Sequence, residues 1–271
     1  MRRIAFLALS TFLAGAAAAP AASAEPVERD FSRHFGKYEG CFASQRLGSD
    51  ELQVHNLALC REPLAPCSTF KMPNTLIGLE SGVIPDADFV LPWDGTRHSR
   101  SELNQDHTLR SAVQQSVLWY FQELARRVGE ERMREYVTRL GYGNRDTSGG
   151  LTEFWLSSSL EVTALEQMGF LARLHRDALP VSKRSMAILR DILVIDESPE
   201  AVLRGKTGSC LDNAGACCSH GWFVGSVTRG EEVYLFASFV KGAWSGEARP
   251  VALAILEELG ILPGASTSEG P

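Results

Sequence analysis

The sequence has little that would place the protein in a membrane or on a nucleic acid. After residue 24, no apolar stretch approaches the roughly 20 residues that a transmembrane helix needs. Acidic residues outnumber basic ones, 33 to 27, and no block of lysines and arginines occurs. Such a chain is poorly suited to binding nucleic acid or an anionic membrane. We therefore expect neither partner once the first 24 residues are removed.

Two common arrangements for hydrolysis are also missing. No C-x-x-C or H-x-x-x-H pattern accompanies Cys217, Cys218 and His220, so we expect no metal site. No serine lies in a G-x-S-x-G elbow, which argues against a Ser-His-Asp hydrolase. The histidines have no identifiable triad partner; they are His34, His55, His98, His107, His175 and His220.

The first 24 residues have the features of a secretory signal peptide. Arg2 and Arg3 precede an apolar run, and Ala22–Ala24 is a small-x-small cleavage pattern. An uncleaved anchor is the alternative, but the run is short for a membrane span. We expect export to the periplasm and a mature chain, residues 25–271, that folds as one catalytic domain.

All six cysteines lie in the mature chain, and an even number in an exported protein favours disulfides. Cys67 is a reactive thiol or a disulfide partner of Cys60 or Cys41, and export favours the disulfide. The pairing of the others stays open, as does the choice between monomer and homodimer.

The hydrophobic pattern predicts strands at both ends of the chain and helices between them. Strand patterns lie near the N-terminus and after Gly205, and periodic helical patterns occupy residues 68 to about 195. The predicted strands are Tyr38–Arg46, Leu52–Leu59, Gly221–Thr228 and Glu232–Val240, and a closing helix spans Glu247–Glu258. This is an α+β plan: an antiparallel sheet built from both termini, with an all-α subdomain inserted at approximately 75–195.

The strongest chemical signal is the S-x-x-K tetrad Ser68–Lys71. On a helix, residues i and i+3 share a face, so the lysine amine can reach the serine hydroxyl. Serine needs a base within hydrogen-bond reach to become a nucleophile. A second tetrad, Ser238–Lys241, lies on a predicted strand, where i and i+3 point to opposite faces, so we interpret it as structural.

Three further motifs follow in order. Ser116–Leu118 (S-V-L) lies in a helical context, and Tyr142–Asn144 (Y-G-N) follows a helix end, where a plain helix stop would also explain it. Lys206–Gly208 (K-T-G) opens the second strand region. There lysine and threonine can hold a substrate carboxylate, and glycine leaves room for a ligand to approach the backbone.

In this order the motifs resemble those of the class D β-lactamases, the oxacillinases, over roughly residues 30 to 262. Further matches are Pro66–Asn74, Phe154–Leu156, Glu166-Gln167 and Gly221–Gly225. The resemblance implies the penicillin-recognising serine-enzyme fold. It also implies hydrolysis of penicillin-type β-lactams, and hence antibiotic resistance.

The resemblance implies a role for each matching residue. Ser68 would be acylated, and Lys71 would be the general base in the form of a carbamate that needs carbon dioxide or bicarbonate but no other cofactor. Trp155 would hydrogen-bond that carbamate, and Ser116, assisted by Lys206, would protonate the leaving nitrogen. The remaining roles concern substrate binding: an oxyanion hole from the N–H groups of Ser68 and Ser209, and a carboxylate site at Thr207 and Arg249.

A physical argument supports the lysine. Free lysine, with a pKa near 10.4, is protonated at neutral pH and is a poor base. Burial among Phe70, Leu118 and Trp155 would lower the pKa of Lys71 and leave an amine that can add carbon dioxide.

Leu118 is a departure, because valine is usual at the third position of S-x-V. It also bears on two alternatives: a non-hydrolytic penicillin-sensing domain and a penicillin-binding transpeptidase or carboxypeptidase. Both families carry asparagine at this place, so Leu118 argues against them.

Overall fold

The computed structural model describes residues 25–156, 159–211 and 218–263. The predicted signal peptide, residues 1–24, and Cys217 lie outside these residues. In the described part of the chain, seven strands form one sheet in the order β1-β3-β2-β9-β8-β7-β6. The strands are β1 (Glu25–Glu28), β2 (Gly40–Arg46), β3 (Glu51–His55), β6 (Val194–Glu197), β7 (Val202–Leu211), β8 (Cys218–Arg229) and β9 (Glu232–Lys241).

Strands from the N-terminal and C-terminal parts of the chain pair in the middle of this sheet, as predicted. Strand β2 pairs antiparallel with β9, from Gly40 opposite Val240 to Arg46 opposite Tyr234. One pairing departs from the antiparallel plan, because β1 runs parallel to β3 at the edge. The short, polar segment that forms β1 carries no strand pattern, so the sequence did not predict it.

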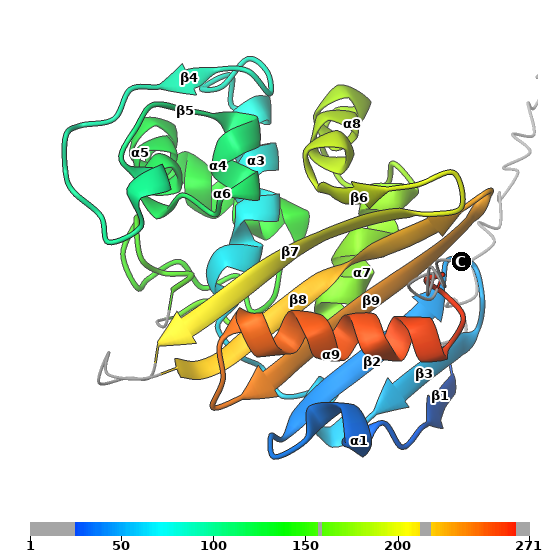
Figure 1. Ribbon diagram of the computed structural model, residues 1–271. Helices are drawn as coiled ribbons and strands as arrows, with labels where there is room; N and C mark the ends of the chain where they lie inside the picture. Colours follow the sequence, from blue (N-terminus) through cyan, green and yellow to red (C-terminus); the bar gives the residue numbers. More distant parts are fainter. Residues whose placement is uncertain (1–24, 157–158, 212–217, 264–271) are drawn as a thin grey trace, which may run out of the picture.

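Helices cover both faces of the sheet (Figure 1). Helix α9 (Ser245–Glu258) packs on β7, β8 and β9 together with α1 (Ser32–Phe35), and α7 (Ala164–His175) packs on the opposite face. Beyond α7 lie the other helices of the inserted region and the small β4–β5 pair (Figure 1). These elements are α3 (Lys71–Glu80), α4 (Leu109–Gln114), α5 (Leu118–Val128), α6 (Glu130–Leu140), α8 (Lys183–Ile192), β4 (Val90–Leu91) and β5 (His107–Thr108).

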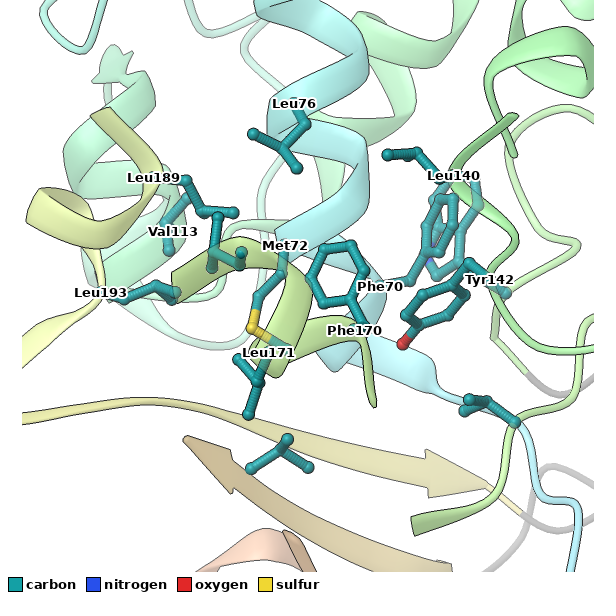
Figure 2. Close-up of a cluster of buried hydrophobic side chains, with 14 of the residues drawn as sticks. Phe70, Met72, Leu76, Val113, Leu140, Tyr142, Phe170, Leu171, Leu189 and Leu193 are labelled. Atoms are coloured by element: carbon teal, nitrogen blue, oxygen red, sulfur yellow. The ribbon is translucent and has the colours of Figure 1, made fainter. Parts of the chain in front are cut away.

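Each face of the sheet buries its own hydrophobic core. Phe223 of β8 and Phe236 of β9 pack toward α9, whereas their neighbours Trp222 and Leu235 pack toward the inserted helices. Figure 2 shows part of the larger core, where Phe70 lies beside Tyr142. This core therefore surrounds the start of α3, directly after the turn that carries the predicted nucleophile.

One predicted strand is too long. Leu52–Leu59 was expected to be extended, but β3 ends at His55 and α2 (Leu57–Cys60) follows. Asn56 ends the strand because it adopts a left-handed conformation (φ 60°), and its side chain accepts a hydrogen bond from the Leu59 N–H. A local cap thus outweighs the strand-like pattern.

Candidate active site

Ser68 lies on a tight turn that leads directly into a buried helix. The 3₁₀ helix η1 (Cys67–Phe70) carries the serine, and Lys71 is the first residue of α3. The Lys71 Nζ lies 2.8 Å from the Ser68 Oγ, a hydrogen-bonding distance. The i, i+3 geometry predicted from the tetrad is therefore present.

The surroundings of Lys71 are apolar. The side chain is 1% exposed, and its amine lies 5.5 Å from the centre of the Phe121 ring. Burial lowers the pKa of Lys71 well below its usual range, and the positive charge of Lys206 lowers it further. Phe121 was not identified from the sequence. Its position three residues after Leu118, on the same side of α5, was the available signal.

Trp155 leaves an unpartnered donor in the same core. It is fully buried and stacks on Phe70, with ring centres 5.4 Å apart. Among the residues that the structure describes, its indole Nε1 has no hydrogen-bond partner. An unpaired buried donor is costly, about 1–3 kcal/mol, so it marks a place suited to an acceptor.

Ser116 and Lys206 form the second polar pair of the site. Ser116 lies between α4 and α5 in a left-handed conformation (φ 58°). The Lys206 Nζ donates to the Ser116 Oγ and to the Thr207 carbonyl oxygen, each at 3.0 Å. Burial, aided by the charge of Arg100, lowers the pKa of Lys206 to about 7. Near neutral pH this amine can therefore both give and take a proton.

The alternation along β7 divides the remaining predicted residues between two faces. Lys206, Gly208 and Cys210 lie on the side of the nucleophile turn. Ser209 lies on the other side, where its hydroxyl is 2.9 Å from that of Ser245 at the start of α9.

Gly208 has a packing reason to be glycine. A Cβ atom there would lie 3.0 Å from the Pro66 carbonyl oxygen and 3.2 Å from the Thr69 nitrogen. The missing side chain therefore lets β7 pack against η1. The room for a ligand that we expected from the sequence stays a prediction.

Thr207 and Arg249 line one hollow beside Lys206. It has a volume of about 400 Å³, and Lys206 also lies in its wall. Arg249 is exposed on α9, and its guanidinium carbon lies 5.8 Å from the centre of the Phe223 ring. A cation and a hydroxyl on one wall suit a carboxylate.

The disulfide partner predicted for Cys67 is wrong. Cys67 pairs with Cys210 on β7, while Cys41 and Cys60 pair with each other. Cys67 faces β7 because η1 packs against that strand, whereas Cys60, at the end of α2, lies beside β2. A bond across 143 positions leaves no local signal, and it excludes the reactive thiol.

Tyr142 and Asn144 hold loops together. The Tyr142 hydroxyl donates to the Gln167 Oε1 at 2.8 Å, and the Asn144 amide donates to the Ser159 carbonyl oxygen at 2.8 Å. Gly143 is required between them, because it has φ 53° and a Cβ would collide with the Glu161 carbonyl. The predicted helix stop is present at Gly141.

Two arrangements that resemble catalytic pairs are structural. Ser238 donates to the Cys41 carbonyl oxygen and Lys241 pairs with Glu62, so the second S-x-x-K tetrad has no serine–lysine contact. His175 lies 2.9 Å from the Ser226 hydroxyl, a pairing that the sequence did not reveal. Ser226 is 1% exposed, and burial lowers the pKa of His175 to about 4.

Neither a metal site nor a membrane span emerges from the described residues. In residues 25–156, 159–211 and 218–263, no three metal-ligating side chains gather. No helix in these ranges is long and apolar enough to cross a bilayer.

Comparisons with known proteins agree with this geometry. A family model, the penicillin binding protein transpeptidase domain, matches residues 35–259. The probable β-lactamase YbxI of Bacillus subtilis (strain 168) is 38% identical over 228 residues, which cover 84% of each chain.

Solved structures give the same picture. A class D β-lactamase from Bacillus subtilis matches with a TM-score of 0.82 and 36% identity, covering 87% of this chain and 98% of its own. The C-terminal domain of the Bacillus licheniformis BlaR penicillin-receptor matches with a TM-score of 0.84 and 34% identity, covering 88% and 98%.

Proposed function

This chain belongs to the class D β-lactamases, a family of serine enzymes, and from that premise we propose how it hydrolyses penicillin-type antibiotics and confers resistance to them. The observation that carries the proposal is the buried amine of Lys71, held 2.8 Å from the Ser68 hydroxyl. Burial lowers the pKa of this lysine well below its usual range and so favours the neutral amine, which can take part in base chemistry beside the nucleophile.

The residues around Lys71 fit a carboxylated side chain. The Trp155 N–H, on a ring that stacks on Phe70, the residue before Lys71, is the donor that we assign to such an anion. A carbamate formed on Lys71 from carbon dioxide would supply an anionic base in a site from which water is largely excluded. Ser68 and Trp155 are the groups of this chain that would hold it.

In the proposed reaction the Ser68 Oγ attacks the lactam carbonyl carbon as its proton passes to the base at Lys71. The ring C–N bond breaks, and the nitrogen takes a proton from Ser116. Lys206, 3.0 Å from Ser116, then replaces that proton. The proton held by the base then passes to Lys206, so that both groups recover their starting states. A water molecule attacks the ester carbonyl carbon as the base takes its proton, the C–O bond to Ser68 breaks, and that proton goes to the Ser68 Oγ. Arg249 and Thr207 bind the substrate carboxylate, and the N–H groups of Ser68 and Ser209 bind the carbonyl oxygen.

Nitrocefin turnover tests this proposal against the main alternative, a penicillin sensor that acylates and then stalls. The similarity to the BlaR receptor domain supports the alternative. Leu118 argues against it, because the resemblance places asparagine there in sensors. We expect many turnovers per molecule. A single stoichiometric burst would overturn hydrolysis in favour of the sensor.

We also infer that the chain is exported and cleaved after Ala24. The two disulfides support this inference, because such bonds persist in oxidising compartments. Protein recovered from the periplasm should begin at Glu25. A mature protein that retains residues 1–24 would contradict the inference.

A further inference from the structure

Three buried polar side chains form a chain of hydrogen bonds behind the nucleophile turn. The Tyr142 hydroxyl donates to the Gln167 Oε1, and the Gln167 Nε2 donates to the Thr69 Oγ1, both at 2.8 Å. The Thr69 hydroxyl in turn donates to the Pro66 carbonyl oxygen at 2.7 Å. None of the three side chains is more than 1% exposed.

These residues come from three separate parts of the fold. Thr69 belongs to η1 and directly follows Ser68, Gln167 lies on α7, and Tyr142 follows α6. Figure 2 shows Tyr142 inside the core beside Phe70. The hydrogen bonds therefore tie the turn that carries Ser68 to two elements that are distant in the sequence.

Filling this part of the core with polar side chains brings a desolvation cost that apolar side chains would avoid. Burying polar groups costs free energy that their hydrogen bonds only partly recover, and apolar side chains of the same shape can be equally stable. Hydrogen bonds have directions, however, so they fix the position of Thr69 more narrowly than apolar packing would. From β7, Gly208 also packs directly on Pro66 and Thr69.

We propose that Gln167 is a positioning residue for Ser68, a role that rests on the proposed function. It contacts no substrate and acts through Thr69. With Gln167 bonded to Thr69 and Gly208 packed on Pro66 and Thr69, the turn from Pro66 to Thr69 keeps the Ser68 Oγ within hydrogen-bonding distance of Lys71. The Y-G-N motif thereby gains a second task, since Tyr142 orients the Gln167 amide.

The main test replaces Gln167 by methionine, which has a similar shape but cannot make these hydrogen bonds. A 1 Å displacement of a reacting group can cost on the order of 100-fold in rate. We expect kcat for nitrocefin to fall on the order of 10- to 100-fold while KM changes by less than about threefold. Gln45→Met is the matched control, because Gln45 hydrogen-bonds the Ser49 carbonyl in a distant turn. It should keep the wild-type kcat.

A second pair of variants covers the case in which Gln167→Met does not fold. Thr69→Val removes the hydroxyl that Gln167 holds, and Thr69→Ser retains it. We expect the valine variant to lose kcat and the serine variant to keep most of it. A folded Gln167→Met protein, or a folded Thr69→Val protein, with kcat within twofold of wild type would overturn the proposal.

The same assay separates this proposal from the proposed function. If the wild-type protein gives only a stoichiometric burst, hydrolysis fails, and the rate of the burst then replaces kcat in the comparison. A slower burst in Gln167→Met than in wild type still supports positioning, and equal bursts overturn it.

Discussion

Lys71 carries a primary amine into the core, where a charge cannot be solvated. Burial lowers the pKa of this amine in the folded protein and so disfavours its charged form, while the unfolded chain protonates it at any pH below about 10.5. The unfolded state therefore binds more protons, and the stability of the folded state is reduced at neutral pH. We interpret this cost as the thermodynamic consequence of keeping a base beside Ser68.

Replacing Lys71 by methionine should remove both the cost and the activity. In buffer depleted of carbon dioxide at pH 7, we expect a free energy of unfolding about 1–3 kcal/mol above wild type, with no turnover of nitrocefin. The gain should shrink as pH rises toward 10.5, because the unfolded wild-type chain then loses its extra proton. Urea denaturation at several pH values measures it, and full turnover by this variant would exclude lysine from the mechanism.

Bicarbonate should raise the activity most at low pH, where a carbamate dissociates. We expect activation of several-fold near pH 6 and little near pH 8. Trp155→Phe removes the donor offered to the anion and should require about tenfold more bicarbonate for the same rate, as expected for a lost hydrogen bond to a charged group. Steady-state kinetics across bicarbonate concentrations measure both effects, and a flat response in the wild-type protein would contradict the carbamate.

Among the elements, strand β7 contributes to the site in two ways, because its side chains alternate between the two faces of the sheet. One side presents Lys206 to Ser116 and packs Gly208 against η1, while the other places Ser209 against α9. The strand therefore aligns the Ser116–Lys206 pair with the turn that carries Ser68. Its fit against η1 depends on the absence of a side chain at residue 208.

Gly208→Ala should consequently disturb both stability and catalysis. The added methyl group meets backbone atoms at 3.0–3.2 Å, so β7 or η1 must move. We expect a loss of about 1–3 kcal/mol in the free energy of unfolding, together with a lower kcat. Gly169→Ala is the control: that site on α7 is open, and alanine there should stabilise the protein by about 0.5–1 kcal/mol. Equal stability of the two variants would show that the packing is not tight.

The elements whose signals are local were predicted well. The strands predicted over Gly221–Thr228 and Glu232–Val240 are present as β8 and β9, and the predicted closing helix is present as α9. The errors lie where context decides: Asn56 ends β3 early, and β1 forms through its parallel pairing with β3 at the sheet edge.

For the site, too, the contacts that depend on local spacing were predicted and those between distant segments were not. Ser68 and Lys71 come into contact because they are three positions apart on a helical turn, and this spacing can be read from the sequence. The contact of Gln167 with Thr69 spans 98 positions and has no periodic signal, although the Glu166-Gln167 pair is one of the matches to the class D β-lactamases.

At the scale of the whole molecule, the Cys67–Cys210 disulfide joins the start of the inserted helices to the C-terminal half of the sheet. It closes a loop of 143 residues, compared with 19 for Cys41–Cys60. All four cysteines are buried to about the same degree, so the cavities left by their removal are similar.

Removing the longer-range bond should therefore cost more stability. We expect the Cys67→Ala/Cys210→Ala double variant to lose about 2–5 kcal/mol, roughly 1–2 kcal/mol more than Cys41→Ala/Cys60→Ala, since a longer loop restricts the unfolded chain more. Urea denaturation of both proteins measures the difference. A smaller loss for the first pair would show that chain entropy does not dominate.

The position of β9 also determines what the molecule tolerates genetically. This strand is formed close to the end of the chain, yet it lies between β2 and β8 in the middle of the sheet. A premature stop codon just before residue 232 would therefore split the sheet rather than trim it, leaving the edges of both β2 and β8 open to pairing with other chains. Such nascent products would be substrates for proteases and chaperones, and activity would be lost by frameshifts that spare Ser68, Lys71, Ser116 and Lys206.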